Sequence, residues 1–587
     1  MLKMFKHLGI KEVISIILSI GLIVLQVWLD LKLPEYMKEI MTLIQTPGSA
    51  TKDILVVGGN MLLLAFASLS AAVVTGFFMA RVAAAFSRRV RGKMFDKITS
   101  FSNEEINNFE TASLITRTTN DVSQIQMFIT MGVQLLIKAP IMAVWSIIKI
   151  YNVGVEWSTA TFVTLILLSI LIAIIMIFVI PKIRKVQSLT DDVTKSVREN
   201  LKGVRVIRAY NAEGFQENKF DVKNNNLTEV VLFTNKAMSF MMPIMNFLMS
   251  VLMIAIYYIG AILLKNQIGD PLLQVDTFAN MLIFSQYAMM VIMAFIMLVM
   301  IFFLLPRSLV SAKRINEVLY TKPKIVDGNI DLEDTKLKGT IEFKNVSFKY
   351  PEAEEYVLKD INLEINKGET VAFIGSTGSG KSTLINLIPR FYDASSGQVL
   401  INGIDVRDYK LFDLNEKIGY VAQKAVLFKG KVSDNIAFGT NKERINDETD
   451  IWEALEIAQA KDFVSELEDK LDSDIAQSGT NLSGGQKQRL SIARAVAKKP
   501  EIFIFDDSFS ALDFKTDRAL RTALKEKTKG TTNLVVAQRI GTIMEADKIV
   551  VLDEGFIVGV GKHKDLLKSC KVYLEIALSQ LTEEELQ

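Results

Sequence analysis

Six long apolar segments fill most of the first half of this 587-residue chain, half of whose residues are hydrophobic. Each segment is long enough to cross a hydrocarbon core about 30 Å thick as a helix. They are Val13–Leu31, Ile54–Phe78, Phe128–Tyr151, Thr159–Ile180, Met238–Leu264 and Phe278–Pro306. One such segment could be a buried helix of a large soluble protein. Six of them, with no comparable segment afterwards, predict a six-span membrane domain.

Basic residues gather in alternate connections between these segments. They are dense at the N-terminus, in the second–third and fourth–fifth loops and after the sixth segment, whereas residues 152–158 contain none. Because positive charge stays on the inner side, both termini are expected in the cytoplasm of a multi-pass cell-membrane protein. Both inward loops are long and helix-prone, which suits helices that project beyond the bilayer. Their stretches Ser102–Phe109 and Tyr210–Phe220 are our candidates for contact with a cytosolic domain.

The sequence changes character after the sixth segment. Residues 321–338 form a polar, turn-rich linker between a membrane domain (1–320) and a second domain (339–587) with a short acidic tail. Short apolar runs then alternate with helical patterns, which predicts a cytosolic α/β domain. The expected strands are Thr340–Lys349, Val357–Ile365, Val371–Ile374, Gln398–Ile401, Ile418–Val421, Glu501–Phe505, Asn533–Val536 and Lys548–Leu552.

A glycine-rich loop follows the expected strand Val371–Ile374 and precedes a helical pattern. It reads Gly375, Ser376, Thr377, Gly378, Ser379, Gly380, Lys381 and Ser382, with Thr383 next. This fills the pattern G-x-x-x-x-G-K-[ST] in the strand–loop–helix context that the motif requires. The glycines allow backbone N–H groups to surround a polyphosphate, Lys381 would reach the β- and γ-phosphates, and the Ser382 hydroxyl would bind Mg²⁺. The fold class expected is an α-helical six-span transmembrane domain followed by a P-loop nucleotide-binding domain.

Two further features belong to the same chemistry. The apolar run Ile502–Phe505 ends in Asp506, which would deliver a carboxylate to the magnesium ion. The stretch Leu482, Ser483, Gly484, Gly485 and Gln486 opens a helix and offers a second anion-binding N-terminus. One polyphosphate cannot easily occupy both N-termini. Two such domains arranged head to tail would let each stretch cap the phosphate that the other domain holds.

With these motifs in this order, the sequence resembles an ATP-binding-cassette (ABC) transporter of the exporter type over nearly its whole length. The resemblance implies ATP and Mg²⁺ as cofactors. It implies that Tyr350 stacks on adenine, unless it is a core tyrosine at a strand end. It also implies that Gln423 contacts Mg²⁺ and senses the membrane loops, and that Asp513 belongs to a loop that communicates across a dimer. The two inward stretches resemble the coupling helices of this family.

The chain departs from the family pattern at two catalytic positions. Asp507 stands where the family places a glutamate that orients the attacking water, and its carboxylate should fall about 1.5 Å short, one bond length. A displacement of about 1 Å can cost roughly a hundredfold in rate. Gln538 replaces the switch histidine, and neither His7 nor His563 could take that place. Glutamine forms hydrogen bonds but does not exchange charge as an imidazole does.

This pattern resembles one subunit of a heterodimeric exporter with one impaired and one competent ATP site. The expected partner is a different half-transporter with the catalytic glutamate and histidine, to whose site this chain lends its Ser483–Gln486 stretch. A slow homodimer that tolerates both replacements is the alternative. A peptide or lipid exporter, or an ATP-gated channel or regulatory subunit, would share the same motifs.

Substrate clues are fewer. Met289, Met293 and Met297 recur every fourth residue and form one face of a helix, which suits either a permissive apolar pocket or simple packing. Asp30 and Lys138 lie within apolar segments, where charges are costly and often functional, although Asp30 could instead be interfacial and Lys138 could be a helix-pairing group. We expect amphipathic or cationic drug-like compounds as substrates, lipid as surroundings, and a bacterial source. The net charge of +2 gives no argument for nucleic acid.

Overall fold

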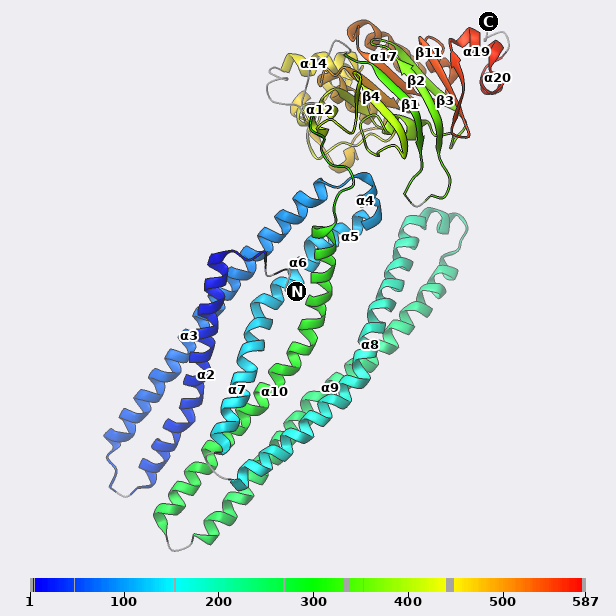
Figure 1. Cartoon of the computed structure of the whole chain (residues 1–587). Helices are drawn as coiled ribbons and strands as arrows, with labels where there is room; N and C mark the ends of the chain where they lie inside the picture. The colour runs from blue at the N-terminus through cyan, green and yellow to red at the C-terminus, as the bar shows by residue number, and fades with distance from the viewer. Residues whose placement is uncertain are drawn as a thin grey trace. The chain divides into compact units, whose positions relative to one another are not determined.

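The computed structural model describes residues 4, 6–46, 48–151, 155–267, 270–330, 338–351, 353–439 and 448–582. Most of the expected linker's second half (331–337) and nearly all of the acidic tail (583–587) lie outside these residues. Contacts divide the chain into two units (Figure 1). The first comprises Met1–Ile98 and Ala112–Thr321. The second comprises Lys322–Gln587 together with Thr99–Thr111, which connects two membrane helices in sequence.

The first unit is helical. Its elements are α2 (Ile10–Gln45), α3 (Thr51–Thr99), α5 (Thr111–Thr116), the π-helical turn η1 (Arg117–Asp121), α6 (Val122–Met127), the π-helical turn η2 (Phe128–Gly132), α7 (Val133–Tyr151), α8 (Val155–Ala209), α9 (Glu213–Asn266) and α10 (Pro271–Tyr320). Among the described residues, six helical stretches are long and apolar enough to cross a membrane. This confirms the six predicted segments, and α5 to α7 together supply the third.

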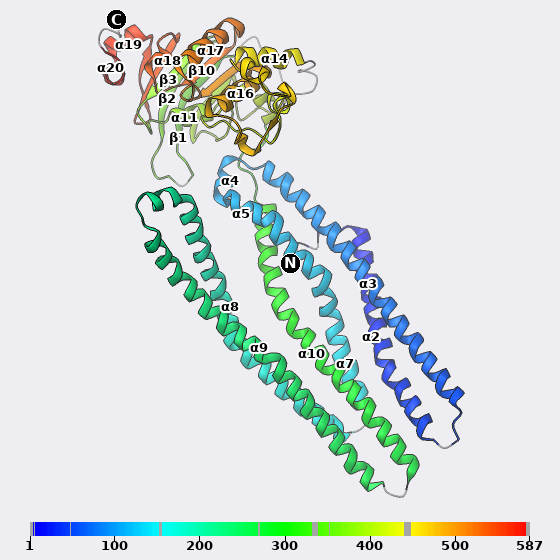
Figure 2. The ribbon, with the colours of Figure 1, turned by 180° about the vertical axis from the view of Figure 1, so that it is seen from behind.

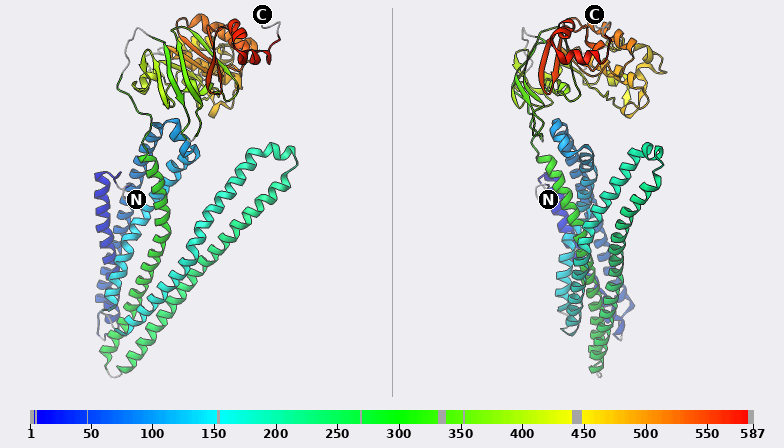
Figure 3. Two further views of the ribbon diagram at one scale, coloured as in Figure 1. Left: turned by 45° about the vertical axis from the view of Figure 1, so that its right-hand side comes forward. Right: turned by 90° about the vertical axis from the view of Figure 1, so that its right-hand side faces the viewer.

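The membrane helices extend well past their apolar cores. At 1.5 Å per residue, the 55 residues of α8 correspond to about 80 Å, far more than the ~30 Å of a hydrocarbon core. Helix α9 has 54 residues and runs beside α8 in every view (Figures 1–3). The turn that joins them lies in the predicted contact stretch Tyr210–Phe220. The other predicted stretch, Ser102–Phe109, contains the short helix α4 (Asn103–Phe109).

Helices α2, α7 and α10 pack together in the same unit (Figure 2). The Tyr287 hydroxyl of α10 is fully buried and donates to the Leu31 carbonyl of α2 over 3.1 Å. The Trp157 indole N–H of α8 donates to the Ile256 carbonyl of α9 over 3.2 Å. Each contact satisfies a polar group that would otherwise be costly in an apolar interior.

Two main sheets form the second unit. An antiparallel sheet has the order β2 (Leu358–Ile365), β1 (Ile341–Phe348), β4 (Ser396–Ile401), β5 (Ile404–Asp405). A largely parallel sheet has the order β12 (Phe556–Gly561), β11 (Lys548–Asp553), β3 (Thr370–Gly375), β10 (Thr532–Val536), β9 (Ile502–Asp506), β6 (Ile418–Val421). Strands β7 (Gly430–Lys431) and β8 (Asp474–Ile475) pair separately. All eight predicted strands are confirmed, but the sequence missed β12, whose two glycines resemble a turn.

The helices of this unit are α11 (Lys381–Asn386), α12 (Leu411–Glu416), α13 (Val432–Ile436), α14 (Glu448–Ile457), α15 (Lys461–Ser465), α16 (Gly484–Ala497), α17 (Phe514–Lys527), α18 (Ile540–Ile543), α19 (His563–Ser569) and α20 (Lys571–Leu578), with 3₁₀ turns η3 (Lys470–Asp472) and η4 (Gln477–Gly479). Strands β3, β10, β9 and β6 are parallel neighbours. Their carboxyl ends therefore meet along one edge of the sheet, the edge where ligands bind in open α/β sheets.

Candidate ATP site and transmembrane charges

The glycine-rich loop joins the central strand β3 to the start of α11. Gly378 and Gly380 have φ angles of 89° and 98°, in the left-handed region that favours glycine. A Cβ atom at Gly380 would also lie 2.8 Å from Leu358 Cδ2. The predicted strand, loop and helix are thus confirmed, and only glycine fits this turn without strain.

Lys381 folds back over this loop. Its Nζ donates to the carbonyls of Gly375 and Ser376 over 2.9 and 2.7 Å, and to Ser379 Oγ over 3.3 Å. Burial lowers the pKa of Lys381, whereas the charges of Asp507 and Asp506 raise it. The ammonium group is therefore held at the mouth of the loop, where it could meet phosphate oxygens.

Ser382 and Asp506 form the candidate magnesium pair. Strand β9 is buried along its whole length, and the Ser382 hydroxyl donates to Asp506 Oδ1 over 2.8 Å. Burial raises the pKa of Asp506, a hydrogen bond from Ser382 opposes this, and the charge of Asp507 raises it further. A cation would relieve that cost. One carboxylate and one hydroxyl suit Mg²⁺, which keeps several waters and shares phosphate oxygens.

Asp507 lies next to this pair and is held by two side-chain amides. Its Oδ2 accepts from Gln538 Nε2 over 2.8 Å and from Gln423 Nε2 over 3.1 Å. Its φ of 48° is left-handed, and its backbone N–H donates to the Val536 carbonyl over 3.0 Å. The three residues come from the ends of β9, β10 and β6. The predicted catalytic positions Asp507 and Gln538 therefore contact each other directly. Gln423 also contacts Asp507, and its contact with Mg²⁺ stays a prediction.

Tyr350 lies beside α11 in an aromatic cluster. Its hydroxyl is 3.0 Å from Thr383 Oγ1. Its ring makes edge contacts with Phe348 and Tyr392, with centroids 5.0 and 5.4 Å away. The tyrosine is half-buried and next to the predicted phosphate loop, and its stacking on adenine stays a prediction.

The Leu482–Gln486 stretch forms the start of α16. Ser483 caps the helix: its Oγ accepts from Gln486 N–H over 3.3 Å, and Gln486 Oε1 accepts from Ser483 N–H over 2.8 Å. Ser483 and Gly484 are exposed. Asp513 is also exposed and caps α17, accepting from Thr516 N–H over 3.0 Å, and this hydrogen bond lowers its pKa. Both helix starts are free to meet another molecule.

The two charges predicted within the membrane segments pair with each other. Lys138 Nζ of α7 lies 3.4 Å from Asp30 Oδ2 of α2. The Ser68 hydroxyl of α3 donates to Asp30 Oδ1 over 2.5 Å. The group thus links three membrane helices, which is the helix-pairing role that the sequence left open. Met289 and Met293 are each 44% exposed and Met297 is half-buried, so this face of α10 is not covered within the chain.

The sequence reading missed a second charged group, between α2 and α7. Glu35 accepts from Lys32 and from Lys149, each over 2.5 Å. A pocket of about 190 Å³ lies here, also lined by Trp28 and Trp145. The i,i+3 spacing of Lys32 and Glu35 could have predicted their ion pair on one helix face. Lys149 is distant in sequence, and only the packing of α7 against α2 brings it to Glu35.

Comparison with known proteins tests the family. Residues 358–510 match the family described as "ABC transporter", and residues 16–295 match "ABC transporter transmembrane region". An uncharacterized ABC transporter ATP-binding protein of Mycobacterium tuberculosis is 38% identical over 533 residues, which is 90% of each chain. The chain belongs to the ABC transporter family. Its order of domains is that of an exporter half-transporter.

Two other proteins are informative about this ABC transporter. An ATP-dependent lipid A-core flippase of Pseudomonas aeruginosa is 31% identical over 514 residues, covering 86% of this chain and 82% of that protein. A bacterial Atm1-family ABC exporter, solved with ATP bound, superposes with a TM-score of 0.80 at 23% identity, covering 97% of this chain and 98% of that one. The latter confirms the predicted fold class.

Proposed function

We propose that this chain is one half of a heterodimeric, ATP-driven exporter with both termini on the cytoplasmic side. Its own ATP site binds ATP with Mg²⁺ but hydrolyses it slowly. Its exposed Ser483–Gln486 stretch completes the ATP site of a partner that carries the usual glutamate and histidine. Membership of the ABC transporter family supports ATP-driven transport by a dimer, and the departures at two catalytic positions support the division of labour.

The observation that carries the proposal is the hydrogen bonding of Asp507. One of its two oxygens already accepts from both Gln423 and Gln538. The shorter side chain also holds its carboxylate farther from the γ-phosphate than a glutamate would, and a misplacement of about 1 Å can cost roughly a hundredfold. Gln538 donates one of its two amide N–H groups to this carboxylate. In contrast, the residues that we propose hold the triphosphate and Mg²⁺ keep the family motif, and Ser382 contacts Asp506.

Two observations bear on the substrate. The uncovered methionine face of α10 suits amphipathic or drug-like compounds, because methionine adapts to varied apolar shapes. Relatives named as lipid A-core flippases favour a lipid as the second candidate. Competition between a fluorescent cationic dye and a phospholipid analogue for transport into proteoliposomes distinguishes the two.

Purification from the native membrane through a tag on this chain tests the proposal. We expect a second, different ABC half-transporter in a one-to-one ratio. In that complex, Asp507→Asn should change ATP turnover less than about twofold, whereas replacing the partner's glutamate by glutamine should lower it at least tenfold.

A variant that restores the two family residues tests the same proposal in the opposite direction. Asp507→Glu combined with Gln538→His should raise hydrolysis at this chain's own site by up to about a hundredfold. Adding Lys381→Ala should remove that gain. A preparation containing only this chain, with rapid turnover that Asp507→Asn abolishes, would contradict the proposal and support a homodimeric pump.

A further inference from the structure

Arg390 occupies a buried turn shortly after α11, the helix that starts at the phosphate loop. It is only 6% exposed, and its φ of 57° places its backbone in the left-handed region, which is uncommon for arginine. Its side chain makes a two-pronged ion pair with Asp393, at 2.8 and 3.3 Å. Burying a charged guanidinium and holding an arginine in the left-handed region both cost free energy, and the contacts of this side chain offset that cost.

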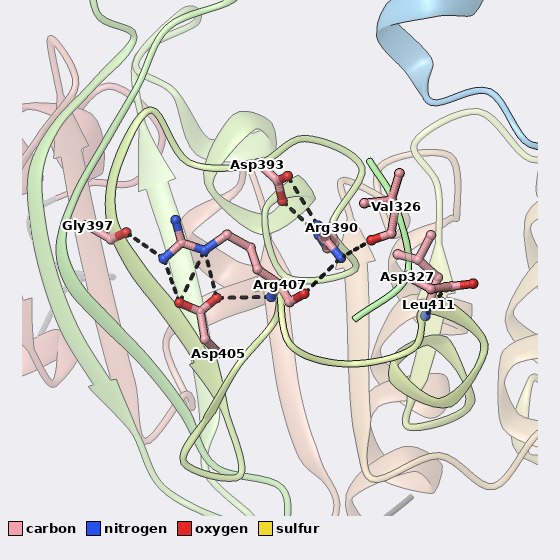
Figure 4. A network of polar contacts seen from close by, with 8 residues as sticks. All are labelled: Val326, Asp327, Arg390, Asp393, Gly397, Asp405, Arg407 and Leu411. Atoms are coloured by element: carbon pink, nitrogen blue, oxygen red, sulfur yellow. Dashed lines mark hydrogen bonds and ion pairs between the residues drawn. The ribbon is translucent and has the colours of Figure 1, made fainter. Parts of the chain in front are cut away.

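The remaining guanidinium nitrogen reaches the segment that follows the last membrane helix. Arg390 Nη1 donates to the Val326 carbonyl over 2.9 Å and to the Arg407 carbonyl over 3.3 Å (Figure 4). Val326 lies six residues after the end of α10 at Tyr320. One side chain therefore bonds to the turn after α11, to the loop at 407 and to the chain leaving α10.

Residues 324–330, which we call the strap, are hydrogen-bonded along their length to the rest of the second unit. The Leu411 N–H donates to Asp327 Oδ1 over 2.9 Å, and Ile330 forms a parallel bridge with Tyr409. Gly328 N–H donates to the Tyr409 carbonyl over 2.9 Å. A Cβ atom at Gly328 would lie 2.1 Å from the Asp408 carbonyl oxygen, so even alanine would displace the strap.

The strap also holds α4. The Lys324 N–H donates to Glu105 Oε1 over 3.1 Å, and its ammonium pairs with Glu104. Helix α4 lies between α3 and α5 in the chain, so the strap and α4 together are continuous with three membrane helices. The covalent chain joins the strap to α10, and it joins α4 to α3 and α5.

A second contact joins the same turn to α4 and to the nucleotide side. The Tyr392 ring packs against Tyr350, with centroids 5.4 Å apart, and Tyr350 contacts Thr383 in α11. Burial raises the pKa of Tyr392, and a hydrogen bond with the Asn107 side chain of α4 acts in the opposite direction. The Phe391 N–H also donates to the carbonyl of Asn386, the last residue of α11, over 3.1 Å, so the turn 390–393 contacts α11, α4 and the strap.

We propose that the turn Arg390–Asp393 is a relay through which ATP bound at the phosphate loop moves the strap and α4, with Arg390 as its positioning residue. Binding of a triphosphate by Lys381, Ser382 and Thr383 shifts α11 and the turn that follows it. Arg390 carries the shift to the strap, and Tyr392 carries it to α4. This relay is independent of whether the chain's own site hydrolyses ATP quickly or slowly.

The test compares Arg390→Gln with Arg407→Gln in the full complex. Arg407 is a matched control, because its guanidinium pairs with Asp405 and donates to the Gly397 carbonyl, on the side away from Val326 (Figure 4). Two quantities are measured: the affinity for a fluorescent ATP analogue with Mg²⁺, and the ATP-induced change in hydrogen exchange at residues 99–111 and 322–330.

Arg390→Gln should keep ATP affinity within about threefold while losing most of the ATP-induced exchange change in both segments. Arg407→Gln should keep both the ATP affinity and the ATP-induced change in hydrogen exchange. Gly328→Ala disturbs the relay from the strap side and should reproduce the Arg390→Gln result. Arg390→Lys, which retains the charge, should be intermediate.

Two results would overturn the relay. One is an undiminished ATP-induced change in Arg390→Gln. The other is a parallel loss of ATP affinity and exchange response, which would make Arg390 a structural support of the nucleotide site. Neither result affects the proposal of a slow ATP site, which rests on Asp507 and Gln538.

Discussion

At the scale of single residues, the Ser483 side chain has two roles, one in capping α16 and one in our proposal for phosphate binding. It caps α16 through Gln486, and it exposes a hydroxyl at a helix N-terminus suited to a phosphate. The capping role is fulfilled within this chain. The hydroxyl can contact a phosphate only if another nucleotide site approaches the exposed end of the helix.

Two substitutions separate these roles. Ser483→Ala removes the cap and should cost about 1 kcal/mol of stability as well as turnover. Ser483→Asp keeps a good cap, so thermal stability should be near that of the unmodified chain, but its negative charge repels a phosphate and ATP turnover of the dimer should fall at least tenfold. Thermal melting and phosphate release are the measurements. Full turnover in Ser483→Asp would remove this serine from the ATP chemistry.

Sequence motifs were sufficient to find Asp506, Asp507, Gln538 and Ser483, because each lies at a fixed place relative to an apolar strand or glycine pair. They could not show that Gln423 and Gln538 share one oxygen of Asp507. That contact depends on the order of β6, β9 and β10 in the sheet, and parallel strands distant in sequence give no local signal of their neighbours.

At the scale of elements, α4 shows how a seven-residue helix is held in place. Ser102 caps it and donates to Glu105, and the same carboxylate accepts from the Lys324 N–H of the strap. Burial raises the pKa of Glu105, but hydrogen bonds from Ser102 and Lys324 outweigh it, and the pKa is lowered overall. The charged form therefore holds α4 and the strap together.

The sign of this shift gives a pH prediction. A carboxyl whose pKa is lower in the folded state stabilises the structure above its ordinary pKa of 4.5, and this contribution is lost as the pH falls through the lowered value. Hydrogen exchange at residues 322–326, corrected for intrinsic rates, should therefore increase below pH 4.5. Glu105→Gln should show the increase already at pH 7. Equal exchange in the two proteins at pH 7 would contradict this account.

The bounds of the helices and strands are the part of the fold that the sequence predicts least well. Apolar periodicity located the spans, and the long, helix-prone inward loops predicted helices that project beyond the bilayer. Helices α8 and α9 confirm this, although the sequence did not give the residues at which they end. It also could not predict the strap, whose contacts are made mainly by backbone groups and by one glycine.

At the scale of the whole molecule, the two units each have their own interior, and the chain passes from one to the other before α4, after α4 and after Thr321. The domain order could be predicted because composition changes sharply near residue 321. The sequence could not predict that residues 99–111 belong to the second unit, because membrane helices precede and follow them in the chain.

The ion pair of Asp30 and Lys138 has an electrical consequence. A single charge crossing a membrane polarised by 100 mV gains or loses about 2.3 kcal/mol. Two opposite charges held together carry no net charge, so a movement that keeps them paired does no work against the voltage. For an uncharged substrate, a transport step that moves only this pair should proceed equally fast in polarised and depolarised vesicles, whereas in Asp30→Asn, which leaves a lone ammonium, the same step should become voltage-sensitive.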